Sequence, residues 1–234
     1  MCLNKNNILF VCGFVLLSMI ACHPQDTITS ATQIRFSQDS VYFDTVFTSI
    51  GSSTQRIMLY NDSKDPVFIE SISSKTTYFQ INLDGENQID LIKHYEIPAQ
   101  DSIFLFIRAC IDPFKQDNPV LIEDTLLFVI DKNVVSLPMQ AYGQDVILLK
   151  TKEGRTEFPS GYTFHANRPY LIYDTVLVAG KMQIMPGATL YMHNNASIYA
   201  LGSVEALGEK NAPITIRGDR LDKLFEKVPY KYAS

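Results

Sequence analysis

Residues 174–218 read DTVLVAGKMQIMPGATLYMHNNASIYALGSVEALGEKNAPITIRG, and this stretch decides the fold class. Glycines separate short apolar runs that are rich in Val, Ile, Leu and Tyr. Gly180 and Gly202 occupy equivalent positions in successive repeats, and Leu190–Met192 corresponds in the same way to Ile214–Ile216. Short strands that recur with a period of about 22 to 24 residues, with glycine at the corners, are typical of a parallel β-helix. Residues 170–234 are therefore predicted to begin a β-helix.

The recurring apolar side chains of this region are expected to point inward and to stack in columns: Val176, Val178, Ile184, Leu190, Ile198, Val204 and Ile214. The sequence is similar here to the right-handed parallel β-helix repeat proteins, most clearly over Ile184-Met185-Pro186-Gly187-Ala188-Thr189-Leu190. Two repeats also leave a second interpretation open, in which these runs are extra strands of a sandwich.

The preceding region, 34–145, reads as consecutive short strands separated by turn-forming residues. The strands are rich in β-branched and aromatic residues, which suit a pleated, half-buried surface. The predicted strands are Ile34–Phe36, Ser40–Val46, Gln55–Tyr60, Val67–Ser73, Tyr78–Leu83, Ser102–Ile111, Thr125–Ile130 and Val134–Ala141. Their spacing favours a β-sandwich. A connector that contains glycine and proline is predicted over 146–169.

Several short motifs in 34–145 resemble the immunoglobulin-like sandwich of the ASH/MSP type. They are Phe43-Asp44-Thr45-Val46, Tyr60-Asn61, Pro66-Val67-Phe68-Ile69, Ile111-Asp112-Pro113 and a final strand that ends at Gly143. The resemblance extends over the whole of this region. It implies an Ig-like domain that serves as a docking or spacing module.

The amino terminus has the pattern of an export signal. Lys5 precedes an uncharged apolar run, Ile8–Ala21, which is shorter than the roughly 20 residues that a membrane-spanning helix needs. Met19-Ile20-Ala21-Cys22 resembles a lipobox, which implies cleavage before Cys22 and acylation of its thiol. An ordinary secretory leader is the alternative. Residues 1–21 are therefore predicted to be a lipoprotein signal peptide, and the polar stretch 22–33 a flexible tether.

Charge and cysteine content restrict the partners. The net charge of −5 becomes −6 when Lys5 leaves with the leader, and this acidic balance disfavours nucleic acid and anionic lipid surfaces. Cys2 and Cys12 also leave with the leader. Cys110, in an apolar run, is expected to be a buried small hydrophobe.

The chain as a whole resembles Gram-negative lipoproteins that contain a right-handed β-helix. Its most recognisable part is Ile216-Arg217-Gly218-Asp219-Arg220-Leu221-Asp222, followed by Val228-Pro229-Tyr230. The resemblance implies an outer-membrane protein of the cell envelope, and members of the family continue through a tryptophan-containing stretch into further turns. This chain has no tryptophan and stops at Ser234, so a truncated β-helix is expected. A short helix through Leu221, Leu224, Phe225 and Val228 could instead cover its last turn.

Chemistry on sugars, which some β-helix enzymes perform, needs paired carboxylates or a metal in one groove. The candidate groups in the β-helix region are Asp174, Glu205, Asp219, Asp222, Arg217 and Arg220. Asp174 and Glu205 fall in different turns, and the others alternate in sign as in a solvated turn. We therefore expect no catalytic residues.

Metal and cofactor sites are also not expected. The histidines, His23, His94, His165 and His193, lack ligand spacing, and His193 is expected in a turn. An acidic loop is favoured over a calcium site for Asp84, Glu86, Asn87 and Asp90. Tyrosines that could stack on sugar rings are Tyr191, Tyr199, Tyr230 and Tyr232.

The sequence thus predicts a non-catalytic envelope lipoprotein that is anchored through Cys22 and presents a β surface to a glycan or protein. The alternative is a truncated relative of β-helix polysaccharide lyases or hydrolases. Neither the ligand nor the membrane face follows from the sequence.

Overall fold

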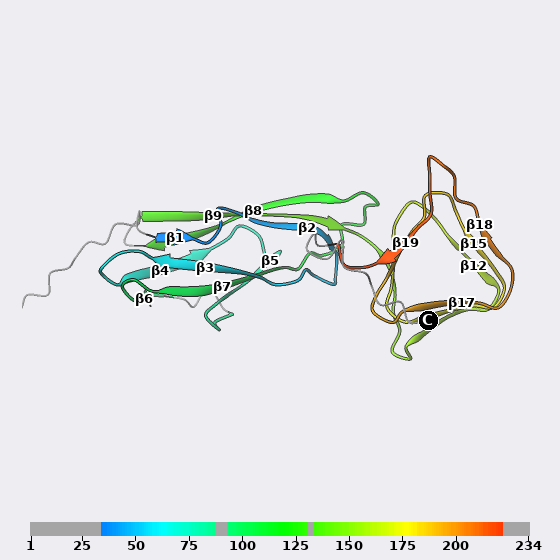
Figure 1. The fold of residues 1–234 in the computed structure, drawn as a ribbon, viewed down its shortest axis with the longest axis horizontal. Helices are drawn as coiled ribbons and strands as arrows, with labels where there is room; N and C mark the ends of the chain where they lie inside the picture. Colours follow the sequence, from blue (N-terminus) through cyan, green and yellow to red (C-terminus); the bar gives the residue numbers. More distant parts are fainter. Residues whose placement is uncertain (1–33, 88–92, 131–132, 222–234) are drawn as a thin grey trace, which may run out of the picture.

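The computed structural model describes residues 34–87, 93–130 and 133–221, and the predicted all-β fold is confirmed, because the regular elements in these ranges are all strands. Figure 1 shows a β-sandwich and a β-solenoid side by side along the longest axis of the molecule. In the part of the chain so described, no helix is long and apolar enough to cross a membrane.

The sandwich consists of two sheets. The four-stranded sheet has the order β1-β3-β7-β5 and is antiparallel throughout, with β1 Ile34–Phe36, β3 Gln55–Asn61, β7 Ser102–Ala109 and β5 Phe79–Leu83. The five-stranded sheet has the order β2-β9-β8-β4-β6, with β2 Val41–Phe47, β9 Asn133–Gln144, β8 Val120–Ile130, β4 Val67–Ser73 and β6 Tyr95–Ile97. In this sheet, β2 runs parallel to β9.

Strict alternation of apolar residues builds the sandwich core. In β7 the side chains of Ile103, Leu105 and Ile107 are buried, whereas those between them face outward. Because successive side chains of a strand point to opposite faces, one face of each sheet meets the other sheet. Phe128 of β8 packs on Phe36 across this core, with 5.3 Å between their ring centroids. The strands predicted from the sequence are therefore recovered, and β6 is added to them.

The solenoid contains about three turns, each with three short strands. The first turn is β10 Ile147–Leu149, β11 Arg155–Phe158 and β12 Gly161–Phe164. The second is β13 Tyr170–Ile172, β14 Thr175–Val178 and β15 Lys181–Ile184, and the third is β16 Thr189–Met192, β17 Ser197–Ala200 and β18 Val204–Ala206. β19 Thr215–Gly218 follows on β16. All pairings are parallel and form the sheets β10-β13-β16-β19, β11-β14-β17 and β12-β15-β18, three sides of a triangle in Figure 1.

Residues 146–169 differ from the predicted connector, because they form the whole first turn of the solenoid. This turn is difficult to recognise from the sequence, because β11 carries Arg155 and Glu157 on its outer face and its residue pattern resembles that of a polar loop. The repeat is also uneven. Gly161 pairs with Lys181, whereas Leu190 pairs with Ile216 and not with Ile214 as predicted, so the last step between turns is the longer one. A small hairpin with a bridge between Glu209 and Ala212 lengthens this step.

Most of the residues predicted to point inward do form the solenoid core. Val176, Val178 and Leu190 have no exposed surface, and Ile184 has 5%. Ile198 and Ile214 are partly buried against them. Val204 is different: it stacks in register on Met182, which is 7% exposed, but is itself 53% exposed. No described residue covers its other side, because no described strand pairs with the far edge of β18.

The difference in exposure between Val176 and Val204 can be tested by placing aspartate at each position. Val176→Asp is expected to destabilise the protein by about 3 kcal/mol or more, because a carboxylate would be enclosed among apolar side chains. Val204→Asp is expected to cost less than about 1 kcal/mol, because the new carboxylate keeps its contact with water. Denaturant unfolding of both variants measures this, and equal losses would contradict the exposed placement of Val204.

Candidate functional site

The junction between sandwich and solenoid is built around one buried carboxylate. β9 ends at Gln144 and β10 begins at Ile147, so Asp145 lies directly between the two modules. Asp145 is 3% exposed and accepts hydrogen bonds from the Thr48 hydroxyl at 3.0 Å and from the amides of Phe114 and Gln116 at 3.1 Å. These bonds tie the end of β9 to the segment after β2 and to the loop that precedes β8.

The backbone of that loop is shaped to hold the carboxylate. Lys115 has a positive φ of 60°, and this left-handed conformation lets the amides on both sides of it converge on Asp145. Burial by itself raises the pKa of Asp145, but the hydrogen bonds from Phe114, Thr48 and Gln116 outweigh it and lower the pKa below the ordinary value of 3.8. The carboxylate therefore stays ionised at neutral pH.

Two further contacts join the same loop and β2 to the solenoid, and a third braces the loop against β9. Arg168 forms an ion pair with Asp117 at 2.8 Å, and the Asp117 carbonyl accepts a bond from the Gln144 side chain. Phe47, at the end of β2, packs on Tyr191 of β16 with 4.9 Å between ring centroids. Tyr191 belongs to the sheet β10-β13-β16-β19, so the sandwich contacts one side of the solenoid (Figure 1).

A groove of about 580 Å³ lies between the two modules, and this is the candidate site. The sandwich contributes Tyr42 and Arg108 to its lining, and the solenoid contributes Tyr173, His193 and Asp219. His193 stacks on Tyr173 at 3.8 Å between ring centroids, with only 12° between the ring planes. Its Nδ1 lies 2.6 Å from Oδ2 of Asp219.

This groove brings aromatic, cationic and carboxylate side chains close together. The ammonium of Lys150 lies 4.6 Å from the centre of the Tyr173 ring, so that ring contacts a cation as well as His193. Burial, and then the charge of Asp219, raise the pKa of Tyr173, which keeps its phenol protonated and able to donate a hydrogen bond. The groove thus combines aromatic surface, a phenol donor and a carboxylate acceptor.

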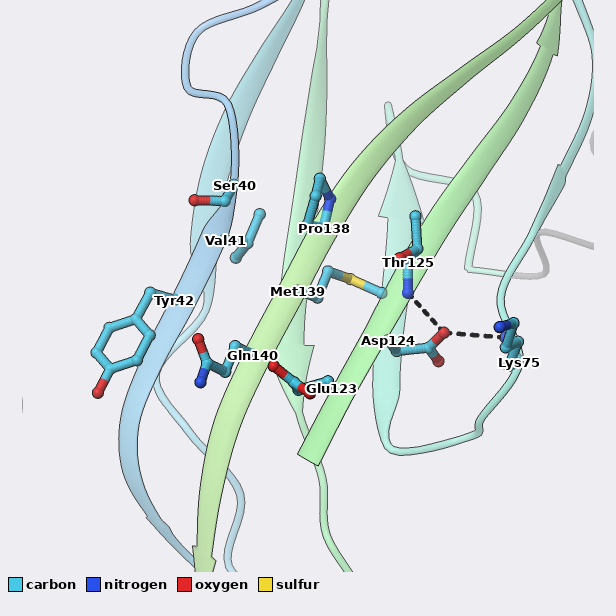
Figure 2. Close-up of a pocket in the computed structure, with 10 residues that line it drawn as sticks. All are labelled: Ser40, Val41, Tyr42, Lys75, Glu123, Asp124, Thr125, Pro138, Met139 and Gln140. Carbon is cyan, nitrogen blue, oxygen red and sulfur yellow. Dashed lines mark hydrogen bonds between the residues drawn. The ribbon is translucent and has the colours of Figure 1, made fainter. Parts of the chain in front are cut away.

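A second hollow, of about 450 Å³, lies against the five-stranded sheet and is drawn in Figure 2. Its buried carboxylate, Asp124, accepts bonds from the amides of Lys75, Thr76 and Thr125 and from the Thr76 hydroxyl. Burial raises the pKa of Asp124, but these bonds outweigh it and bring the pKa below 3.8. Asp124 therefore fixes the turn after β4, and its oxygens are engaged by the protein itself.

The structure separates most of the carboxylates considered from the sequence. Asp174 accepts a bond from the amide of Thr151, and Glu205 pairs with Lys181 at 2.8 Å. The partnership of Asp219 with His193 was not predicted, because the alternating charges around Asp219 indicated a solvated turn. The signal for it is the register: Met192 pairs with Gly218, so the residues that follow, 193 and 219, also stack. Asp222 lies outside the described residues.

The acidic loop and Cys110, which the sequence also singled out, make contacts within the sandwich. The acidic loop is a hairpin: Asp84 accepts a bond from the Tyr95 hydroxyl, and Leu83 bridges to Glu86, while Asp90 lies outside the described ranges. Among described residues, no group of three or more His, Cys, Asp or Glu could hold a metal ion. Cys110 is half-buried, where full burial was expected.

The histidines and tyrosines considered from the sequence do not gather in one site. His193 begins a turn, as expected, and His94 stacks on Phe68. Tyr191 packs in the junction and Tyr199 is 56% exposed. Tyr230, Tyr232, His23 and Cys22 lie outside the described residues.

Comparison with solved structures gives distant likenesses. No protein-family model matches the sequence, and no curated protein matches it. A family 123 glycoside hydrolase from Clostridium perfringens is 8% identical with a TM-score of 0.36, over 48% of this chain and 26% of that one. A protein of unknown function from Porphyromonas gingivalis W83 is 16% identical with a TM-score of 0.34, over 50% and 51%. The E. coli chaperone DraB is 13% identical with a TM-score of 0.31, over 48% and 54%. The chain spans at most 54% of these three chains, and such likenesses assign no function.

Proposed function

We propose that this protein is a non-catalytic scaffold of the cell envelope, lipid-anchored through Cys22, that presents the groove and the adjoining β surfaces to a glycan or protein. The observation that carries the proposal is the junction. An ion pair and an aromatic contact join the two modules, and a buried carboxylate fixes the chain where it leaves the sandwich, as a spacer that must keep a fixed geometry requires. The side chains of the groove come from both modules, so its shape depends on that geometry.

Two finer assignments belong to the same proposal. Two sheets whose strands pair mainly antiparallel support an Ig-like sandwich of the ASH/MSP type. The short apolar leader and the sequence Met19-Ile20-Ala21-Cys22 support export and acylation, with the outer membrane as the expected location. Two or three acyl chains would hold the protein firmly, since each buried methylene contributes about 0.8 kcal/mol.

The anchor is tested by Cys22→Ala in the bacterial cell. We expect the variant to lose incorporation of a labelled fatty acid and to accumulate as an uncleaved precursor or a soluble product, because the acylated thiol is gone. Membrane fractionation and intact-mass measurement provide the readout. Cys110→Ala is the matched control and should be labelled and retained like the wild type, since its thiol lies in the sandwich.

Unchanged labelling of Cys22→Ala would refute the anchor. The non-catalytic part of the proposal has a separate test. If the purified protein cleaved a polysaccharide, and His193→Ala or Asp219→Asn abolished turnover, the groove would be an active site and the scaffold assignment would be wrong.

A further inference from the structure

The two sheets of the sandwich carry charges of opposite sign. Within the strands of the four-stranded sheet the charged side chains are all cationic: Arg35, Arg56 and Arg108. Within the described strands of the five-stranded sheet they are all anionic: Asp44, Glu70, Glu96, Glu123 and the buried Asp124. The molecule as a whole is acidic, so the cationic sheet stands out against its background.

The outer face of the four-stranded sheet, named here the arginine face, has the composition of a protein interface. Phe104 is 38% exposed and stacks on Phe106 with 6.0 Å between ring centroids. The guanidinium of Arg56 lies 5.4 Å from the Phe104 ring centre, and Met58 lies opposite Phe104 in the strand register. Aromatic residues, methionine and arginine are the types enriched where proteins bind each other.

The outer face of the five-stranded sheet, named here the glutamate face, combines exposed apolar side chains with carboxylates. Leu121 and Val134 are 45% and 63% exposed, and Glu123 lies two residues from Leu121 on the same face of β8. Glu70 and Glu96 stand on β4 and β6 of the same sheet. The strands of each face thus combine exposed apolar side chains with charges of one sign, although Arg35 pairs with Asp62 and Glu70 lies 3.5 Å from His94.

We propose that the arginine face of one copy binds the glutamate face of a second copy. The occupant follows from charge complementarity: the chain itself supplies an acidic, partly apolar surface that matches its own cationic, aromatic one. Because the two faces lie on opposite sides of one sandwich, the contact is heterologous, and each copy can bind two neighbours. The copies would then form rows. The proposal does not depend on the lipid anchor, and Arg56 and Glu123, the residues that test it, do not line the groove, although Arg108 does.

Reversal of the charge at Arg56, at Glu123 or at both tests whether the two faces bind each other. Full chains with two different affinity tags are co-expressed, solubilised in mild detergent and purified through one tag, and the co-purified second chain is quantified. Arg56→Glu in both copies, or Glu123→Lys in both copies, is expected to reduce co-purification about tenfold, because like charges then face each other. The double variant R56E/E123K, in both copies, is expected to restore it, since the opposite charges are only exchanged.

A matched control is Lys152→Glu, which makes the same change of charge on the exposed loop before β11. It should leave co-purification unchanged. Circular dichroism of each variant verifies that it is folded. The proposal is overturned if no second chain co-purifies, if the single reversals have no effect, or if the double variant fails to recover. Copies that merely share a detergent micelle would co-purify equally in every variant, which also overturns it.

Discussion

Replacing Gly180 with alanine is expected to be among the most destabilising single changes in the solenoid, with a loss of about 3 kcal/mol or more. A Cβ at this position would lie 2.5 Å from the carbonyl carbon of Ser160 and 2.7 Å from the amide nitrogen of Gly161. Both atoms belong to the backbone of the preceding turn. That backbone is held by the pairing of β11 with β14 and of β12 with β15, so it cannot move aside without loss of hydrogen bonds.

Denaturant unfolding of Gly180→Ala against the wild type measures the effect. Gly202→Ala should behave alike, because its Cβ would collide with the Gly180 carbonyl group of the turn below. Gly208→Ala is the control: the nearest atom to its Cβ is the amide nitrogen of Ile214 at 3.4 Å, so little change is expected. If Gly180→Ala were as stable as the wild type, the backbone at Gly180 could not lie as close to Ser160 and Gly161 as the structure shows.

The second large effect is expected at Asp145. Asp145→Ala leaves the Thr48 hydroxyl and the amides of Phe114 and Gln116 without their acceptor at a buried position. An unsatisfied buried donor costs about 1 to 3 kcal/mol, so a total loss of about 3 kcal/mol or more is expected. The loop around Lys115 also holds Asp117, the partner of Arg168, so hydrogen exchange should increase on both sides of the junction.

The same carboxylate predicts how stability depends on pH. The pKa of Asp145 is lower in the folded protein than the 3.8 of the free group, so the folded state binds a proton less readily than the unfolded state. Its contribution is therefore complete above the unfolded value and is lost as the pH falls through the folded value. Asp145→Asn removes this dependence, so its stability should fall less steeply in acid than that of the wild type. Equal slopes would show that Asp145 does not carry the acid sensitivity.

How far sequence patterns could predict the fold varies along the chain. Alternation in β7 and the glycine spacing of Gly180 and Gly202 are local signals, and both predicted strands that the structure contains. The first solenoid turn was missed, because polar residues on the outer face of β11 interrupt the apolar pattern. The offset at Ile216 arose because a hairpin insertion near Glu209 changes the step between turns without changing the strands.

The sequence by itself determined the all-β class, the division into sandwich and repeat, and most of the inward columns, because side-chain alternation and glycine corners are properties of neighbouring residues. Only the tertiary structure decided the groove, the partnership of His193 with Asp219 and the role of Asp145. These contacts join residues 26 to 97 positions apart, as in the bond between Thr48 and Asp145. Such pairs meet only after distant strands such as β2 and β9 pair and solenoid turns stack, so no local pattern specifies them.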